Sequence, residues 1–599
     1  RNHSSAASDV YKRQAEHFSH LLKHLFFPVF SHDFPPLLNH RLYSRSSRPY
    51  MNSTLVISQQ FKTRCRVAGL MAEESILEST ERTSGREALR TNVQAAIALA
   101  GAVRSTLGPK GLDKLLVDDT GDTLVTNDGV TVLETAKVEH PVAKMIISAS
   151  STQDRVARDG TTTTVVICAE MLRNAWQLVR QGVHPSIIAR GFAQAEAFAL
   201  SSLDELSIDA TPQQIESAIE TSLAGKLDKG MEKHLANLSL EAGQVILSNG
   251  RADPTRVKII KQTGGTMQDT TLITGLALAK SRIHPEMKER GGPGSILILD
   301  GGLERKKPQF EAKLNITSAG MLDAFRAAES KAVLAQVDNL VKIGCDLLVC
   351  KEGVDDEARQ ALSKHGILTY RRVEKRDLDL LSSACGANLV PDAGRATKAD
   401  LGAFIKTREE LRGGVNHWIL DAEDSGATLI ARGSTQSVLD EVERCFADGL
   451  GVACQLLEEP VLLPGAGATQ VALGRRLRRF AESVPGREQL AIEAWADALE
   501  SIPRALAANA GFDGIDSLLK LTAAHSESGD HMGLDLSDGM AKDTISRGVL
   551  EPMSITRQAI SGATEAAISI LRIDDVLWAQ MDAQVPDDVQ ERIQGFGAE

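Results

Sequence analysis

The middle of the chain limits the fold most narrowly, because short apolar strands alternate there with helical stretches. The strand candidates are residues 295–299, 346–349, 367–370 and 387–390. Helical patterns at about residues 355–365 and 375–384 separate the later strands. Strands that alternate with helices form a sheet covered by helices. The sequence therefore predicts an α/β layer domain at the centre of the chain.

Both flanks of this α/β segment are predicted to be helical. An alanine-rich helix is expected from Thr91, and beyond Gly413 helical patterns continue to about Leu571. At roughly 100–200 residues per domain, a chain of 599 residues has room for three or four domains. The simplest architecture is a helical domain built from both ends of the chain, with the α/β domain inserted between them.

A helical arm is predicted within the inserted segment, at residues 318–343. Leu334, Val337 and Val341 are expected to share one face of this arm.

Charge and cysteine content exclude several classes of function. The net charge of −12 argues against a general nucleic-acid binder, because phosphate backbones attract basic surfaces. No run approaches the roughly 18 apolar residues of a membrane span. The 7 cysteines include no CxxC pair and form no disulfide framework, which indicates a reducing, cytoplasmic compartment with buried thiols.

Residues 1–70 differ from the rest of the chain, being basic, rich in serine and poor in acids. Such a stretch imitates an organelle transit peptide, and its histidines imitate a metal-binding tract. We favour a leader that does not belong to the folded protein, with initiation at Met51 or Met71.

A glycine followed by four threonines opens a predicted helix directly after Asp159. Free N–H groups and hydroxyls at such a helix start can bind an anion, and the aspartate before them could hold Mg²⁺. The competing interpretation is ordinary N-capping by Asp or Thr.

Two further turns carry polar groups that suit phosphate chemistry. Residues 106–111 (TLGPKG) allow close backbone approach, although a plain turn is the alternative and no Walker A loop is present. Asn127-Asp128-Gly129 is predicted to be a tight turn between strands. Asp128 and the distant Asp448 would activate a water molecule if the fold brought them together, but each alone is better explained as a turn or helix-surface residue.

Taken in order, these segments resemble a group II chaperonin, the family of the archaeal thermosome and the eukaryotic cytosolic ring. The resemblance runs from about Ser75 to Val576, and within the family the sequence looks most like that of a thermosome subunit. It rests on TLGPKG, TNDGVTVL, DGTTTTVV, SRIHP, VERCFADG, PGAGAT, ANAGFDGID and GVLEP with the following QAISGATEAAISILRIDDV.

The resemblance implies a three-domain chaperonin fold and a double-ring assembly. The rings would be homo- or hetero-oligomeric and eight-membered, and would enclose unfolded client proteins without nucleic acid or membrane partners. A helical protrusion at about residues 316–344 would close the chamber. The implied domains are equatorial (71–207 and 466–599), intermediate (208–272 and 429–465) and apical (273–428).

The family's site residues transfer to matching positions of this chain, with ATP and Mg²⁺ as the implied cofactors. Asp159 would be linked to Mg²⁺, and Asp128 with Asp448 would position and activate water. Lys226, in TSLAGKL, would sense the γ-phosphate, whereas Gly467 and Glu551 would lie beside the nucleoside. The implied phosphate contacts are Thr106, Leu107, Gly108, Pro109, Gly160, Thr161, Thr162 and Thr163.

The chain departs from the family pattern at a few positions near these motifs. Arg158 replaces the first glycine of GDGTTT, Ala466 interrupts a triple glycine, Gln470 replaces a glutamate, and Gly449 replaces an alanine. These changes could tune ATP affinity or turnover, but they remove no acidic catalytic group.

The expected function is ATP-dependent folding of captured proteins, with ATP hydrolysis as the enzymatic step. One alternative is a chaperonin-like scaffold that keeps the fold but does not hydrolyse ATP. The other is an unrelated metabolic enzyme that uses ATP, for which the sequence offers no second substrate site.

Overall fold

The computed structural model describes residues 80–117, 121, 123–304, 319–423 and 425–579. The predicted leader at residues 1–70, both candidate start codons and the first residues of the predicted protrusion lie outside these ranges. The segment Arg82–Leu577 forms one compact unit, which contains nearly all of the described helices and strands. Strands β1 (Thr80–Ser84) and β23 (Asp575–Ala579) lie at the two ends of the described chain.

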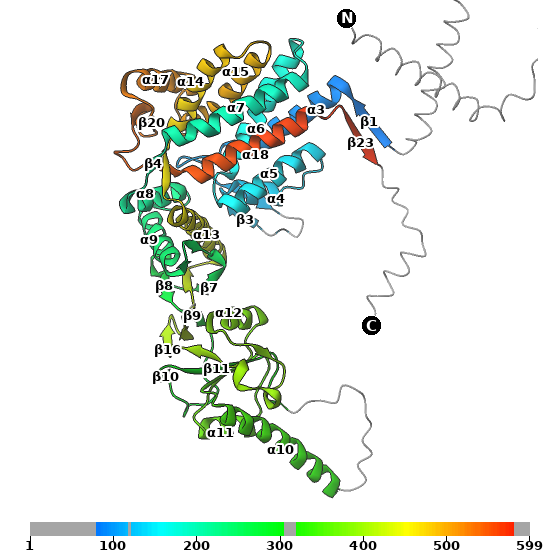
Figure 1. Cartoon of the computed structure of the whole chain (residues 1–599), viewed down its shortest axis with the longest axis vertical. Helices are drawn as coiled ribbons and strands as arrows, with labels where there is room; N and C mark the ends of the chain where they lie inside the picture. The colour runs from blue at the N-terminus through cyan, green and yellow to red at the C-terminus, as the bar shows by residue number, and fades with distance from the viewer. Residues whose placement is uncertain (1–79, 118–120, 122, 305–318, 424, 580–599) are drawn as a thin grey trace, which may run out of the picture. The chain divides into compact units, whose positions relative to one another are not determined.

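One hydrophobic core is built from helices near both ends of the chain. Figure 1 shows α18, coloured red, lying beside the blue and cyan helices α3, α5 and α6, and these helices are in contact. The helices of this part are α3 (Gly85–Arg104), α4 (Gly129–Thr135), α5 (Pro141–Ala157), α6 (Thr161–Arg180), α7 (Pro185–Leu206), α14 (Ala468–Ser483), α15 (Glu488–Leu499), α16 (Ser501–Asn509), α17 (Gly514–Ser528) and α18 (Met553–Leu571).

Short strands complete this part of the chain. Strands β2 and β3 form one two-stranded sheet, and β20 and β21 form another. Strands β22, β19 and β4 form a three-stranded sheet in that order. The strands are β2 (Lys114–Val117), β3 (Thr123–Thr126), β4 (Ile208–Asp209), β19 (Val461–Pro464), β20 (Met532–Asp535), β21 (Met540–Asp543) and β22 (Leu550–Pro552).

Local sequence signals explain where several of these helices begin. Helices α5 and α7 each start with a proline, Pro141 and Pro185, whose missing N–H would have had no partner at a first helical position. The residues before them, His140 and His184, cap the helices through their side chains. Proline and a capping residue therefore fix the start of both helices.

The predicted α/β layer is present in the middle of the chain. Strands β11, β12, β13 and β14 pair in parallel in the order β13–β12–β11–β14, and β15 pairs antiparallel with β11. A second, antiparallel sheet has the order β10–β16–β17–β9. The elements are β9 (Leu276–Leu278), β10 (Arg290–Gly291), β11 (Gly294–Leu299), α10 (Ala319–Ile343), β12 (Leu347–Cys350), α11 (Asp356–Lys364), β13 (Leu368–Tyr370), α12 (Lys375–Cys385), β14 (Leu389–Val390), β15 (Gly402–Phe404), β16 (Lys406–Arg412) and β17 (Val415–Asp421).

The helical arm forms as α10, but the face predicted for it is wrong. Val333, Val337 and Leu340 are buried, whereas Leu334 and Val341 are 38% and 41% exposed. Two of the three buried residues therefore lie one position before the residues that the sequence pattern suggested. Apolar residues on both sides of the stripe made the sequence pattern ambiguous.

A third hydrophobic core is also built from two separated segments, which flank the α/β segment in the sequence. It combines three helices with a sheet in which β18 pairs parallel with β7 and antiparallel with β8. The elements are α8 (Pro212–Leu223), α9 (Lys229–Ile246), β5 (Leu247–Ser248), β6 (Arg251–Ala252), β7 (Val257–Thr263), β8 (Thr271–Thr274), β18 (Ala427–Gly433) and α13 (Gln436–Glu458).

One sequence expectation needs correction here, and the predicted domain limits can be compared with the strands. The chain does not return directly to helices after Gly413, because β17 and β18 come first. The predicted domain limits at 272/273 and 428/429 fall inside β8 and β18. The mixed helical and α/β class is confirmed, and the domain limits themselves stay predictions.

Candidate functional site

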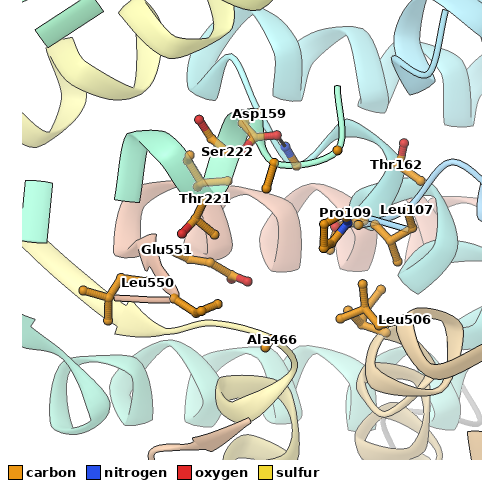
Figure 2. Close-up of a pocket in the computed structure, with 18 of the residues that line it drawn as sticks. Leu107, Pro109, Asp159, Thr162, Thr221, Ser222, Ala466, Leu506, Leu550 and Glu551 are labelled. Carbon is orange, nitrogen blue, oxygen red and sulfur yellow. Dashed lines mark hydrogen bonds between the residues drawn. The ribbon is translucent and has the colours of Figure 1, made fainter. Parts of the chain in front are cut away.

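A pocket of about 800 Å³ collects residues from segments that are far apart in the sequence. Figure 2 shows Leu107, Pro109, Asp159, Thr221, Ala466 and Glu551 around this space. The predicted site residues that line it are Thr106, Leu107, Gly108, Pro109, Asp128, Asp159, Gly160, Thr161, Thr162, Thr163, Lys226, Asp448 and Glu551.

Gly467 is the predicted site residue that does not line this pocket, although Ala466 and Gln470 do. Gly467 precedes α14 with a φ of +81°. A Cβ added there would lie 2.7 Å from the Cβ of Pro503. In this structure, glycine is required at position 467 by its φ and by its close approach to Pro503.

The start of α6 is open toward the pocket. Gly160 occupies the N-cap position with a φ of +80° and provides no side chain, so no side-chain hydrogen bond caps the helix. The Asp159 carboxylate accepts a hydrogen bond from the Gly160 N–H at 2.7 Å instead of capping the first turn. The N-capping alternative for this segment is therefore wrong, and the first-turn N–H groups remain available to an anion.

The TLGPKG turn packs against the loop that carries Lys226. Asn509 donates hydrogen bonds to the carbonyls of Arg104 and Leu107, which fixes the turn against α16. A Cβ added to Gly225 would lie 2.5 Å from the Pro109 Cα, so the two backbones touch only because residue 225 is glycine. This contact places Lys226 directly beside the turn.

Asp128 begins a helix and does not sit in a turn between strands as predicted. It is the N-cap of α4, and its carboxylate accepts hydrogen bonds from the Val130 and Thr131 N–H groups at 3.3 and 3.0 Å. The Thr131 hydroxyl donates a further bond at 2.6 Å. The cap holds the carboxylate in a fixed orientation at the edge of the pocket.

Asp448, on α13, forms an ion pair with Lys226, whose Nζ lies 2.7 Å from the carboxylate. The two side chains are only 14% and 18% exposed. Burial raises the pKa of Asp448, Lys226 opposes the rise, and the carboxylates of Asp128 and Asp159 add to it, which together bring the pKa to about 7. Burial disfavours the charged lysine, but the carboxylates of Asp448 and Asp159 outweigh it and raise the pKa of Lys226. Lys226 therefore stays charged, and Asp448 can change protonation near neutral pH.

A threonine connects the two distant aspartates. The Thr126 hydroxyl accepts hydrogen bonds from the Asp128 N–H at 3.1 Å and from the Arg444 guanidinium at 2.9 Å. Arg444 lies one turn before Asp448 on α13. The fold therefore brings the segments of Asp128 and Asp448 together, which the sequence could not establish.

Glu551, on β22, is half-buried on the side of the pocket formed by the C-terminal segments. Burial raises its pKa to about 7, the nearby carboxylate of Asp159 raises it as well, and hydrogen bonds from Thr556 and Gln470 oppose the shift. A neutral or readily protonated carboxyl at this place can donate as well as accept a hydrogen bond.

Sequence reasoning missed a large part of the pocket wall. No short motif identifies these residues, because separate elements contribute them one or two at a time. They include Thr221, Ser222, Ile502, Leu506, Leu534, Asp535, Lys542, Arg547, Ile555 and Ile560. Their apolar members provide a surface on which a flat ring can pack.

The departures from the family pattern cluster around the same pocket. Arg158 and Ala466 both line it, and both have a positive φ, 57° and 52°. A Cβ at Gly449 would lie 2.8 Å from the Ser239 hydroxyl, so the usual alanine would crowd α9 here. Glycine at 449 therefore avoids crowding α9, whereas Arg158 and Ala466 hold backbone conformations that favour glycine.

Among the described residues, no group of three or more His, Cys, Asp or Glu side chains could hold a metal ion by itself. A Mg²⁺ ion that is bound through one or two carboxylates and the phosphates of a nucleotide needs no such group. Asp159, beside the open start of α6, fits this mode. Within the described ranges, no helix is long and apolar enough to cross a membrane.

The fold and the pocket agree with the class of protein found by comparison. The model of the TCP-1/cpn60 chaperonin family matches residues 99–581. The chain therefore belongs to the TCP-1/cpn60 chaperonin family.

Individual relatives place the chain more closely within that family. It is 40% identical over 511 residues to a thermosome subunit of Pyrococcus horikoshii, covering 84% of this chain and 93% of that protein. A thermosome subunit of Methanocaldococcus jannaschii is 41% identical over 511 residues, covering 84% and 94%. The thermosome subunit beta of Thermoplasma acidophilum is 40% identical over 510 residues, again covering 84% and 94%.

The prediction of a group II chaperonin subunit is confirmed by these matches, and a chaperone function follows from it. The alternatives of a non-cycling scaffold and of a metabolic enzyme are not favoured.

Proposed function

We propose that this chaperonin subunit binds ATP with Mg²⁺ in the pocket described above and hydrolyses it to drive a folding cycle. The observation that carries the proposal is the meeting of Asp448 and Lys226 with the open start of α6 in one pocket. An anion site beside a carboxylate whose pKa is raised to about 7 suits the general-base hydrolysis of a phosphoanhydride at neutral pH.

The phosphates would lie against the start of α6 and the TLGPKG turn. Gly160, Thr161, Thr162 and Thr163 line the pocket, no side chain caps the first turn of α6, and the helix dipole favours negative charge there. Thr106, Leu107, Gly108 and Pro109 form the adjoining wall.

Asp159 is the proposed Mg²⁺-linked carboxylate. Bound Mg²⁺ would neutralise phosphate charge and orient the reacting group. The hydrogen bond from the Gly160 N–H holds one oxygen of Asp159 in place, which leaves the other carboxylate oxygen for the ion.

Asp128 and Asp448 are proposed to position and deprotonate the attacking water. The pKa of Asp448, raised to about 7 by burial and by the neighbouring carboxylates, makes it a base matched to neutral pH. Lys226 neutralises part of the negative charge around Asp448 and is proposed to respond to the γ-phosphate.

The nucleoside is proposed to lie between β22 and the start of α14. Glu551, Ala466 and Gln470 line this part of the pocket, with Ile502 and Leu506 on its apolar side. We keep Gly467 as a structural neighbour of the nucleoside site.

Hydrolysis is proposed to act on a ring assembly through the three cores. The proposed domains remain equatorial (71–207 and 466–599), intermediate (208–272 and 429–465) and apical (273–428). Asp448 and Lys226 belong to the proposed intermediate domain. ATP binding at the pocket would therefore change the position of this domain and, through it, the position of the apical domain. Two stacked eight-membered rings, homo- or hetero-oligomeric, would enclose unfolded clients beneath the protrusion at residues 316–344.

A cytoplasmic location stays part of the proposal. The six cysteines within the described residues are all free and buried, which suits a reducing compartment.

Phosphate release from ATP, without any co-substrate, tests this proposal. Assembled particles are assayed with Mg²⁺ and with EDTA, and the Asp448→Ala variant is assayed beside them. We expect Mg²⁺-dependent hydrolysis that falls to near background in the variant while rings still form. Wild-type rings that bind ATP and never hydrolyse it would favour the scaffold alternative.

A further inference from the structure

Arg158 and Gly451 fit together across the boundary between the phosphate segment and α13. A Cβ added to Gly451 would lie 2.3 Å from the Cγ of Arg158 and 2.4 Å from its Cβ. Separations below 3 Å between such atoms require something to move, so the carbon stem of Arg158 occupies the space that any other residue at 451 would need.

Arg158 and Gly451 form the two sides of this contact, and each lies close in the sequence to an aspartate of the proposed catalytic site. Arg158 ends α5 in the left-handed region, with a φ of 57°, and directly precedes Asp159. Gly451 is buried on α13, nearly one helical turn after Asp448. The contact therefore joins the backbone that presents Asp159 to the helix that presents Asp448.

The stem of Arg158, and not its charge, makes this contact. The guanidinium is turned toward Asp154 at 4.0 Å, and the Arg158 side chain is 44% exposed. An arginine commonly packs its methylene groups on a surface while its charged end stays in water. A residue with a comparable unbranched stem would fill the same space.

A second contact holds the same end of α13 to α5. The Gln455 amide donates a hydrogen bond to the Val156 carbonyl at 3.1 Å, and its oxygen accepts one from Ser554 at 2.6 Å. Gln455 lies one turn beyond Gly451. Helix α13 is therefore tied to the end of α5 by a hydrogen bond and by the Arg158 stem.

We propose that Arg158 is a positioning residue for ATP hydrolysis, whose stem seats on Gly451 and thereby sets the position of Asp448 relative to Asp159. The proposal rests on the proposed ATPase function. It also gives the arginine that replaces the family's usual glycine a specific role, because an arginine can be accommodated there only opposite a residue without a side chain.

A double-mutant cycle tests the proposal. Gly451→Ala is made in the wild-type, Arg158→Gly and Arg158→Met backgrounds, and kcat and KM for Mg²⁺–ATP are measured on assembled full-length particles. In the wild type we expect kcat to fall about tenfold with a smaller change in KM, since a displaced Asp448 affects the chemical step more than binding. In the Arg158→Gly background the added methyl group has room, and we expect Gly451→Ala to change kcat by less than about twofold.

The methionine background separates packing from charge. Methionine keeps an unbranched stem without the guanidinium, so the penalty of Gly451→Ala should persist there. Gly101→Ala on α3 is the control for a glycine-to-alanine change in a helix, because a Cβ at Gly101 meets no atom within 4 Å. We expect it to leave kcat unchanged.

Equal penalties for Gly451→Ala in the wild-type and Arg158→Gly backgrounds would overturn the positioning role while leaving the proposed ATPase intact. A penalty that disappears in the Arg158→Met background would also overturn it, because the charge would then be responsible. If wild-type particles do not hydrolyse ATP, the proposed function fails first and the positioning role fails with it. The melting temperatures of the same variants show whether a lost activity reflects unfolding.

Discussion

The ion pair between Lys226 and Asp448 predicts a specific pH dependence of ATP hydrolysis. Asp448 must lose its proton to act as a base, and its pKa is raised to about 7, so kcat should rise with pH through about 7. Lys226 opposes this rise in the Asp448 pKa. The Lys226→Met variant should therefore show the acid limb of its kcat–pH profile at a higher pH than the wild type.

Lys261 offers a matched control for the loss of a lysine that is paired with carboxylates. It pairs with Asp440 and Glu443 on α13, but its side chain is 36% exposed. The Lys261→Met variant should keep the wild-type profile. An acid limb that moves equally in both variants would show that general charge, and not the buried pair, sets the pKa.

Asp128 combines a structural and a proposed chemical role, and two substitutions separate them. Asparagine caps helices as well as aspartate, so Asp128→Asn should keep the melting temperature while kcat falls by about 10²-fold or more for want of a carboxylate. Asp128→Ala should lose the cap as well, at a cost of about 1 kcal/mol in the free energy of unfolding.

Thermal unfolding and single-turnover hydrolysis measure the two effects of the Asp128 variants. If Asp128→Asn hydrolyses ATP at the wild-type rate, Asp128 is a cap alone and Asp448 must act without it.

At the level of helices and strands, the period of apolar residues predicted the α/β layer and failed where neighbouring apolar residues blurred it. The parallel strands at the centre were predicted because each is a short apolar run between helical patterns. The face of α10 was predicted one residue away because Val333 and Leu334 are both apolar, and only packing decides which is buried. Asn127-Asp128-Gly129 fits both a turn and a helix start, since Asp serves in either.

The contact between Gly225 and Pro109 predicts that two loops move as one unit. Gly225→Ala would place a Cβ 2.5 Å from the Pro109 Cα, at a φ of +86° that also disfavours alanine. We expect the loop carrying Lys226 to separate from the TLGPKG turn, with a several-fold rise in KM for ATP, which corresponds to about 1 kcal/mol, the lower end of what overpacking costs.

Gly182→Ala is the control for backbone strain alone. Gly182 has a similar φ of +91°, but an added Cβ meets nothing within 4 Å. This variant should lose some stability and keep the wild-type KM. Equal KM changes in the two variants would mean that strain, and not the contact with Pro109, matters.

At the scale of the whole molecule, the sequence could name the motifs of the site but not the pocket they form. Asp159 and Lys226 were identified because they lie in recognisable segments, and the fold brings both to one space. The apolar wall, with residues such as Leu506 and Leu534, comes from single positions on separate elements, so no local pattern reveals it. The same holds for Gly451, whose importance depends on a side chain from a segment nearly 300 residues away.

The most direct test of the account is the ATP-dependent refolding of a denatured client protein by the assembled particle. Three particles are compared under Mg²⁺–ATP: the wild type, Asp448→Asn and Asp440→Asn. Asp448→Asn keeps the shape of the side chain and removes the base, whereas Asp440 lies on the same helix with its side chain 37% exposed. The account predicts that wild type and Asp440→Asn capture and refold the client, while Asp448→Asn captures it and does not release it folded. Equal refolding by Asp448→Asn would contradict the claim that hydrolysis at this pocket drives the cycle.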